Sequence, residues 1–412
     1  MTGISSVVVP ITGAELARAR QYLYGGLAWG VGAEVWTLVL LAFAYYSGAS
    51  AAVAAGLRRW TPRRWAVDSG VTAALMIYGL IGLLPFSFYV DFVRERRFGF
   101  EHLGTAAWLA EWAESSVVTV ITAVVVATIA YAWVGRRPSE AQRRLGALGP
   151  PSRRQHKRDA RLGRAGARAN YWWLKLWVVM AAAVVVAVAV EPVVIEPLFN
   201  DFTPVRNAAL RTDIEALARR AGIPHAHIYE MDASRQSAHT NAYVVGILGS
   251  QRIVLYDTMI ARQPPAEIEF VVGHEIGHYV LHHLWKGVGF TVALLLGWFA
   301  IMGWIFPRLS RGESGADVAA LPLVLLILVT LVYLSAPVTN GFSRWEEHQA
   351  DAYGLRLTPA PCAAVASFVR EERTDLIYPD PPGWMVEWFF NHPDQQERIN
   401  FASQACLAAR PQ

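Results

Sequence analysis

Residues 267–306 read EIEFVVGHEIGHYVLHHLWKGVGFTVALLLGWFAIMGWIF, in which a helical pattern with two histidines runs into a long apolar segment. Residues four apart lie on one face of a helix, so His274 and His278 can present two imidazoles to one metal ion. Glu275 is displaced around the helix, within reach of a water on that metal. Two nitrogens beside a carboxylate favour Zn²⁺ over Mg²⁺ or Ca²⁺, which prefer oxygen ligands. The alternative is a set of ordinary polar residues on an exposed helix, because HExxH also arises by chance.

The apolar segment after this motif is one of six runs long enough to cross a bilayer, which takes about 20 residues each. The six runs are Leu23–Tyr46, Ala66–Val90, Gly104–Val134, Trp172–Ile195, Leu284–Phe306 and Val318–Val338. Charged residues make up only 17% of the chain, against about 25% in soluble domains. The pattern therefore predicts a multi-span membrane protein rather than a soluble protein with buried helices.

Some of these runs carry acidic residues, such as Glu34, Asp68, Glu111 and Glu114. A charge at membrane depth is costly unless it faces water or the interior of a helix bundle. Either the helices enclose a hydrated space, which we favour, or these residues lie near the interfaces. The segment from Arg136 to Arg168 is rich in Arg, Gly, Ser and Pro, which predicts a solvated, poorly ordered loop.

The charge and the cysteines both bear on partners and environment. The net charge is +4, but the basic residues concentrate in loops beside apolar runs, which fits anionic lipid headgroups better than nucleic acid. We therefore expect a lipid bilayer as a partner and no nucleic acid. Cys362 and Cys406 form no metal-binding pair and no disulfide framework. We expect two separate thiols rather than a disulfide between them.

The segment at 196–283 has the pattern of a soluble α/β region. Thr212–Ala221 is predicted to be helical, with its N-cap at one of its first two residues. Short strands are predicted at His227–Met231, Ala242–Ile247 and Arg252–Tyr256. Pro265 then opens the helix that carries the two histidines. His282 and His283 are expected to act as partners of the helix dipole rather than as ligands.

A catalytic zinc site needs a third protein ligand and an open position for water. The run NGFSRWEEHQAD at 340–351 supplies candidates just after an apolar run: Glu346, Glu347, His348 and Asp351. Glu347 and Asp351 are four apart and share a helical face, so one can bind the metal while the other orients a histidine ligand. Spacing alone does not rank Glu346 against Glu347, and it does not exclude His348.

The chain divides into five parts on these patterns. They are 1–170, an N-terminal membrane region with three spans and a basic loop; 171–195, the fourth span; 196–283, the α/β segment with the HEIGH helix; 284–338, two further spans; and 339–412, a C-terminal segment that completes the metal site.

In these motifs the chain resembles the membrane-embedded CAAX prenyl proteases of type I and their bacterial relatives, a gluzincin group that includes the HtpX-like heat-shock proteases. The resemblance extends from about residue 18 to residue 401. The blocks that carry it in order are PFSFYVDFVRERRFGF, EPLFNDFTP, SAHTNAYVVGI, QRIVLYDTMI, EIEFVVGHEIGHYVLHH, NGFSRWEEHQADAYG and FFNHPDQQERI. It implies a mainly α-helical bundle of membrane helices that encloses a hydrated chamber, with a gluzincin-type zinc metalloprotease domain containing a small β-sheet.

The family motifs imply particular roles at the metal. The zinc ligands match His274, His278 and Glu347, with one Zn²⁺ per chain, and Glu275 matches the general base. Asp351 matches an aspartate that orients a ligand.

Four further residues match positions near the substrate or the metal. Asn241 and Ala242 fall where the family aligns the substrate backbone along an edge strand. The family places the residues matching His392 and Arg398 close to the metal, so His392 is expected to stabilise the oxyanion and Arg398 to hold the carboxylates. Without the resemblance, His392 would be interpreted as a surface residue before a proline turn.

The resemblance implies an integral-membrane zinc endopeptidase that uses metal-activated water and Glu275 as base. Its substrate would be a peptide or protein, membrane-associated or lipidated, and its role CAAX-type processing or quality control of membrane proteins. The expected location is a cell membrane, the inner membrane of a bacterium. The competing class is a non-enzymatic membrane zinc carrier or scaffold, which would place its ligands inside spans near mid-bilayer.

Charge and resemblance disagree about orientation. The positive-inside rule places the basic loops at 58–64 and 136–168 in the cytoplasm, which with six spans puts the catalytic segment outside. The family implies a catalytic segment that faces the cytoplasm. We take the family's orientation as the expectation, because a half-embedded zinc domain constrains orientation more than loop charge does.

Overall fold

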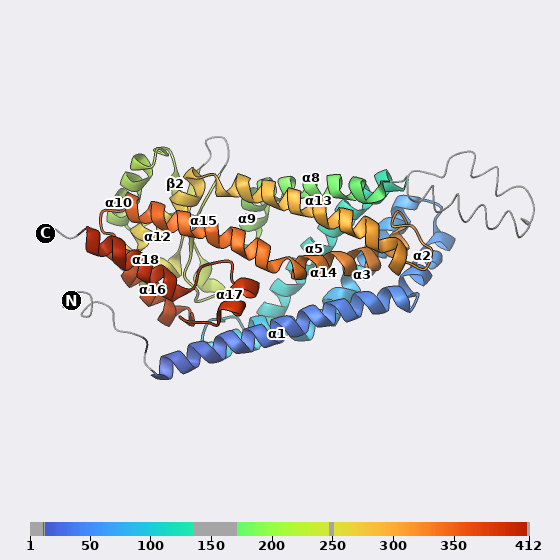
Figure 1. Cartoon of the computed structure of the whole chain (residues 1–412), viewed down its shortest axis with the longest axis horizontal. Helices are drawn as coiled ribbons and strands as arrows, with labels where there is room; N and C mark the ends of the chain where they lie inside the picture. Colours follow the sequence, from blue (N-terminus) through green and yellow to red (C-terminus); the bar gives the residue numbers. More distant parts are fainter. Residues whose placement is uncertain (1–10, 12, 136–170, 247–250, 410–412) are drawn as a thin grey trace, which may run out of the picture.

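The computed structural model describes residues 11, 13–135, 171–246 and 251–409. It consists of a long bundle of apolar helices and, at one end, a region in which a sheet and shorter helices pack together (Figure 1). The loop predicted at 136–168 and the last residue of the strand predicted over Ala242–Ile247 lie outside the described residues.

Among the described residues, five helical segments are long and apolar enough to cross a membrane. They are Gly13–Tyr46 (α1); Arg64–Phe98, made of α3 (Arg64–Ser87), η1 (Phe88–Arg94) and α4 (Glu95–Phe98); Thr105–Val134 (α5); Trp172–Phe199, made of α8 (Trp172–Val190), η2 (Glu191–Ile195) and α9 (Glu196–Phe199); and His283–Leu309 (α13). A sixth span results if Val318–Leu334 (η4 and α14) and Ala336–Leu357 (α15), bent by 52°, count as one. Each predicted run falls on one of these segments. Exposed side chains such as Phe43, Ile81 and Ile121 suit helices whose solvent is lipid.

A four-stranded sheet lies beside the bundle, with the strand order β1–β2–β4–β3. The strands are Phe202–Pro204 (β1), His227–Met231 (β2), Ala242–Val245 (β3) and Arg252–Tyr256 (β4). β2 and β4 are parallel, and β1 and β3 run antiparallel to their neighbours. The sequence predicts β2, β3 and β4 but not β1, because a three-residue strand that ends in proline gives no alternating pattern.

The sheet shares its core with two helices, α10 (Ala208–Arg220) and α12 (Pro265–Val280). Buried apolar residues recur at helical spacing on both: Leu210, Ile214 and Leu217 on α10, and Ile268, Val272 and Ile276 on α12. The predicted start of α10 at Thr212 is wrong. The helix begins one turn earlier because the side chain of Asn207 accepts a hydrogen bond from the backbone N–H of Leu210 and caps it.

Helix α15 crosses α12 at unusually close range. A Cβ atom at Gly354 would lie 2.9 Å from the backbone nitrogen of His274, closer than real contacts allow. A Cβ at Gly277, within the HEIGH run, would lie 3.0 Å from the Cβ of Tyr353. The absence of side chains at these points lets the two helices touch. This contact places the acidic residues of α15 over the histidines of α12.

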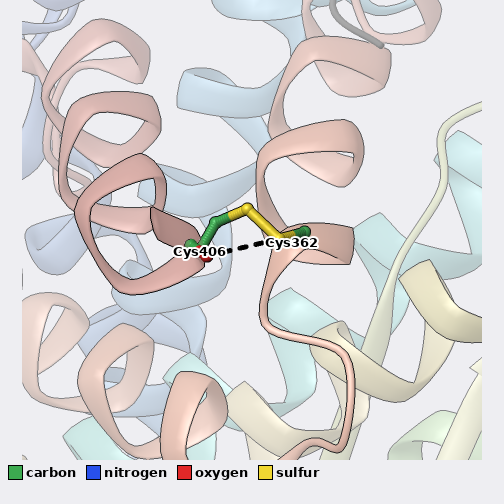
Figure 2. The surroundings of a disulfide bond; sticks show 2 residues. All are labelled: Cys362 and Cys406. Atoms are coloured by element: carbon green, nitrogen blue, oxygen red, sulfur yellow. Dashed lines mark hydrogen bonds between the residues drawn. A yellow bond between two sulfur atoms is a disulfide. The ribbon is translucent and has the colours of Figure 1, made fainter. Parts of the chain in front are cut away.

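The C-terminal segment adds three helices, α16 (Cys362–Thr374), α17 (Gly383–Phe389) and α18 (Gln395–Ala408). Gln395 at the start of α18 donates to the carbonyl of Phe368 in the middle of α16 and to the carboxylate of Glu371 further along it. The end of α18 lies at the start of α16, so the two helices run in opposite directions. These two ends are joined by a disulfide between Cys362 and Cys406, whose Cα atoms are 4.6 Å apart (Figure 2). The prediction of two separate thiols is therefore wrong, because helix packing joins cysteines that are 44 residues apart in sequence.

Candidate active site

Two helices bring three potential metal ligands together. His274 and His278 lie on one face of α12, and Glu347 faces them from α15. The Nε2 atoms of the histidines are 3.0 Å apart. Glu347 Oε2 lies 3.3 Å from His274 Nε2, and its Oε1 lies 3.4 Å from His278 Nε2. One potential ligand atom from each residue lies within 4.8 Å of the others, an arrangement that can surround one ion.

The surroundings of these three residues fit a cation. Glu347 Oε2 is buried and makes no hydrogen bond, which is costly unless a positive charge satisfies it. Burial alone would lower the pKa of His274, but the carboxylates of Asp351 and Glu347 raise it to about 10. The carboxylates around His274 thus favour a positive charge beside its ring. Two imidazoles and one carboxylate are the donor set of catalytic zinc sites that keep a fourth position open.

A buried carboxylate orients His274 from behind. Asp351 Oδ1 lies 2.8 Å from His274 Nδ1, which directs the Nε2 atom toward the ligand cluster. Arg398 of α18 donates two hydrogen bonds to the same carboxylate, of 2.7 and 2.9 Å. The guanidinium also lies 4.3 Å over the ring of Phe368. Arg398 thus balances the charge of Asp351 and fixes its position.

His283 orients the second histidine, His278, a role that the sequence does not predict. Its Nδ1 lies 3.0 Å from Nδ1 of His278, and its side chain is buried. The preceding His282 has a φ of 59°, and this left-handed residue turns the chain between α12 and α13 so that His283 folds back. The expectation of a helix-dipole partner is therefore wrong for His283. The sequence signal that could have indicated this role is the pair His282 and His283 directly after the motif.

Glu275 lies beside the ligands without belonging to the group of three. Its Oε1 is 3.9 Å from His274 Nε2. The carboxylate lines a cavity of about 590 Å³, hereafter the active-site cavity, which Tyr22, Asn241 and His392 also line. Burial raises the pKa of Glu275, as suits a group that accepts and returns a proton.

The structure distinguishes the remaining candidates near the ligands. His392 Nε2 lies 3.3 Å from Glu347 Oε2, and its half-exposed ring faces the active-site cavity. Of the alternatives on α15, Glu347 belongs to the potential ligand group. His348 instead packs against the ring of Phe401, 4.5 Å away. Glu346 has a buried oxygen without a hydrogen bond but lies outside the group.

Asn241 and Ala242 lie at the start of the edge strand β3. Asn241 lines the active-site cavity with His274 and Glu275. Its carbonyl accepts from the N–H of Tyr256 on β4, and its side chain accepts from the N–H of Ala242. Among the described residues, β3 pairs with β4 alone, so its outer edge can receive an extended peptide.

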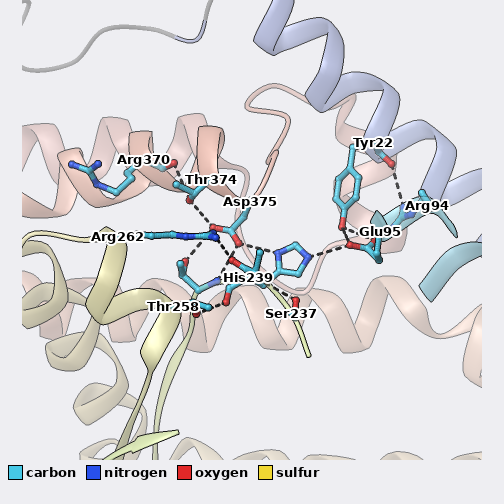
Figure 3. Close-up of polar contacts among 12 residues, drawn as sticks. Tyr22, Arg94, Glu95, Ser237, His239, Thr258, Arg262, Arg370, Thr374 and Asp375 are labelled. Atoms are coloured by element: carbon cyan, nitrogen blue, oxygen red, sulfur yellow. Dashed lines mark hydrogen bonds and ion pairs between the residues drawn. The ribbon is translucent and has the colours of Figure 1, made fainter. Parts of the chain in front are cut away.

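A second polar cluster lies just before β3 (Figure 3). The ring of His239 lies between two carboxylates, with Nδ1 2.9 Å from Asp375 and Nε2 3.3 Å from Glu95. Its face stacks on Phe100 at 4.0 Å. Burial alone would lower the pKa of His239, but the hydrogen bonds to Asp375 and Glu95 raise it to about 9. The ring is therefore an imidazolium at neutral pH.

This cluster joins three distant parts of the chain. Glu95 belongs to the apolar segment Arg64–Phe98 and also accepts from the hydroxyl of Tyr22 on α1. Asp375 follows α16 and accepts from the N–H and hydroxyl of Thr240. His239 thus links the membrane helices, through Glu95, to the residues that precede β3.

The fold and the site define a class. Apolar helices of membrane-spanning length are joined to a region with a potential zinc site. Two histidines of α12 and Glu347 of α15 form this site, and Glu275, which is not one of the three, faces the cavity. This is a multi-pass membrane metalloprotease.

Two family models match the chain. Residues 204–405 match the model described as Peptidase family M48, and residues 7–137 match the model described as CAAX prenyl protease N-terminal, five membrane helices. The chain therefore belongs to peptidase family M48, and the predicted family and the predicted mainly α-helical membrane fold are confirmed.

Similar proteins agree with this assignment. The chain is 38% identical over 240 residues to an uncharacterized metalloprotease, YhfN, of Bacillus subtilis. This match covers 57% of the chain and 56% of the length of that protein. It is 29% identical over 344 residues to a CAAX prenyl protease 1 homolog of Oryza sativa, covering 81% of the chain and 72% of the relative. The crystal structure of S. mikatae Ste24p matches with a TM-score of 0.75 and 22% identity, covering 96% and 92% of the two chains.

Proposed function

We propose that the chain is a zinc-dependent endopeptidase that hydrolyses peptide bonds in the active-site cavity. The observation that carries this proposal is the position of Glu275. A carboxylate that faces the cavity beside the ligand group, and does not belong to it, is what a general base requires. A zinc carrier or scaffold needs ligands but no such base, so the enzymatic interpretation fits better.

Each residue of the site then has a role. His274, His278 and Glu347 would hold one Zn²⁺ per chain, which supplies an acidified water and polarises the scissile carbonyl. Glu275 accepts the proton of the attacking water and passes it to the leaving amine. Asp351, held by Arg398, orients His274, and His283 orients His278.

Two further elements would bind the substrate. The substrate backbone adds to the outer edge of β3 at Asn241 and Ala242, where main-chain hydrogen bonds align it beside the ligand group. The Nε2 atom of His392, next to Glu347, donates a hydrogen bond to the oxygen that becomes negative as the carbonyl is attacked.

The substrate would be a membrane-associated peptide or protein. One side of the active-site cavity is formed by Leu23 and Leu27 of α1, a helix with the length and composition of a membrane span. A segment that leaves the bilayer can therefore reach Glu275 without crossing bulk water. Comparing a farnesylated CAAX peptide with its unmodified form would show whether a lipid contributes to binding.

The proposed location is the inner membrane of a bacterium, with six spans in which η4, α14 and α15 form one. The bent pair Val318–Leu334 and Ala336–Leu357 supports this number, and the similarity to a Bacillus subtilis protein supports a bacterial membrane. The division into 1–170, 171–195, 196–283, 284–338 and 339–412 is part of the same proposal.

The test compares purified full-length wild type with Glu275→Gln, using an unfolded protein as substrate and measuring zinc content in both. Glu275→Gln should keep its zinc and lose more than about 99% of its activity, as expected when an acid–base group worth about 10²–10⁴-fold is removed. Glu269→Gln, on the same helix, is the matched control and should remain active. Full activity in a zinc-loaded Glu275→Gln protein would refute the proposal.

A further inference from the structure

The disulfide lies in the catalytic domain, by which we mean the sheet, α10, α12 and residues 339–409. It joins the two helices that support the metal site. Cys362 begins α16, which carries Phe368, and Cys406 lies near the end of α18, which carries Arg398 (Figure 2). Arg398 lies over the ring of Phe368 while it holds Asp351. The cross-link therefore ties together the pair of helices from which Arg398 reaches the metal site.

A disulfide in this position indicates a compartment. Such bonds form and persist in oxidising surroundings and are rare in the cytosol, where thiols are kept reduced. Cys406 is buried, whereas Cys362 is exposed at the start of α16, so the bond joins the packed interior of the domain to its surface. The disulfide therefore indicates that the catalytic domain faces the oxidising side of a membrane.

At the opposite end of the molecule, the described helix ends are flanked by basic sequence. There α2 (Ala49–Trp60) and the start of α3 meet the segment before α14, as the ion pair of Arg58 with Asp317 at 2.9 Å shows. The basic residues at this end include Arg58, Arg59, Arg63 and Arg64. The helices α5 and α8 also end and begin there (Figure 1). The sequence that connects them, from Arg136 to Arg168, is strongly basic, with Glu140 and Asp159 as its acidic residues.

Short basic loops remain on the cytoplasmic side of a membrane. Because this end lies away from the sheet and from α12, the helix that carries His274 and His278 (Figure 1), the same rule puts the catalytic domain on the other side. Loop charge and the disulfide are independent observations, and they indicate one orientation. It is the reverse of the orientation that the family resemblance implies.

We propose that the catalytic domain lies on the oxidising, extracytoplasmic side of the membrane, and that its substrates are exported segments of membrane-associated proteins. The second half of this proposal rests on the proposed peptidase function. Cytoplasmic prenylated proteins would not reach the active-site cavity in this orientation.

The first test measures the disulfide in cells. Bacteria that express the full chain are quenched in acid, the protein is denatured, and a maleimide-polyethylene glycol is added before or after reduction. Wild type should gain no mass before reduction and two additions after it. Cys406→Ser is the control and should gain one addition without reduction. Two additions to unreduced wild type would show free thiols and overturn the assignment of an oxidising compartment.

The second test measures orientation directly. Single cysteines are introduced at Asp213, exposed on α10 of the catalytic domain, or at Ser152 in the basic segment, with the native disulfide kept. In intact cells a membrane-impermeant maleimide should label Asp213→Cys, and Ser152→Cys should become reactive after the cells are permeabilised. The reverse labelling pattern would overturn the proposal.

The third test addresses the substrate. A single-span reporter carries an unfolded casein segment on its exported side or, in a second version, on its cytoplasmic side, and is expressed with wild type or Glu275→Gln. Cleavage of the exported version by wild type alone is expected. Cleavage of the cytoplasmic version would overturn the proposed substrate class. Absence of peptidase activity in the purified enzyme would instead reject the proposed function and leave the labelling result to decide orientation.

Discussion

The active-site cavity is bordered by two histidine–carboxylate clusters that differ in how they are built. In the first, His274, Asp351 and Arg398 form a chain of contacts entirely within the catalytic domain, and Asp351 is 1% exposed. In the second, His239 lies between Asp375 of that domain and Glu95 of a membrane helix, and its side chain is 36% exposed.

The difference separates two tasks. A buried cluster held by short contacts can fix the direction of a ligand nitrogen, because its members have no alternative partners in water. A cluster that joins two structural regions instead fixes how these regions lie relative to each other. We therefore expect changes in the first cluster to affect zinc and stability, and changes in the second to affect the placement of β3 and hence substrate binding.

The largest effect is expected for Asp351→Asn. The change removes the charge that compensates the buried guanidinium of Arg398, which should reduce the free energy of unfolding by about 3–5 kcal/mol. It should also weaken zinc binding by about 10–100-fold, because His274 loses its orienting carboxylate. Denaturant unfolding in detergent and competition with a zinc chelator measure the two quantities.

The exposed Asp213 on α10 provides the control, and Asp213→Asn should change neither quantity. If Asp351→Asn kept both wild-type stability and wild-type zinc affinity, the buried cluster would have no part in holding the metal site.

An intermediate effect is expected where α12 and α15 touch. Gly354→Ala places a methyl group 2.9 Å from the backbone of His274, so the helices must separate, at a cost of about 1–3 kcal/mol in the free energy of unfolding. The movement also takes Glu347 away from the histidines, so zinc affinity should fall. Gly341→Ala on the same helix has room, since its nearest neighbour would be Arg344 Nη2 at 3.8 Å. Equal behaviour of the two variants would contradict the close-contact argument.

The smallest effect on stability is expected for His239→Gln. The ring contributes as an imidazolium, and its 36% exposure reduces the contribution to about 1 kcal/mol through solvent screening. Its pKa of about 9 in the folded protein exceeds the ordinary value of 6.5. The contribution is therefore complete below pH 6.5 and is lost as the pH rises through 9.

His239→Gln also shows whether His239 positions β3 relative to the membrane helices or only adds to stability. His239→Gln should raise KM more than it lowers kcat, because β3 is displaced while the metal site is intact. Wild-type KM should increase between pH 8 and 10, and the KM of the variant should change little over this range. A variant that retains the wild-type KM profile would show that His239 does not position the substrate strand.

The sequence predicts elements whose signals are local. Six apolar runs and the spacing of His274 and His278 require nothing beyond the neighbouring residues, and the structure places helices over all of them. The choice between Glu346 and Glu347 is different, because adjacent residues point in different directions from a helix. The crossing of α15 on α12 determines which of them faces the histidines.

The features that the sequence does not predict depend on contacts between distant segments. Cys362 and Cys406 are 44 residues apart, and His239 is 136 and 144 residues from its two carboxylates. No periodic pattern records such pairs. His283 was missed for a more local reason, since its role depends on the left-handed conformation of His282, which is uncommon for a residue other than glycine.

The most direct measurement for the central claim is reconstitution of the metal-free enzyme. Zinc is removed with a chelator and its loss is confirmed by elemental analysis, and then Zn²⁺ is added back in steps while cleavage of an unfolded protein is followed. Activity should be absent without metal and should reach its maximum at one Zn²⁺ per chain, bound at His274, His278 and Glu347. Undiminished cleavage by a protein shown to be free of metal would contradict the account.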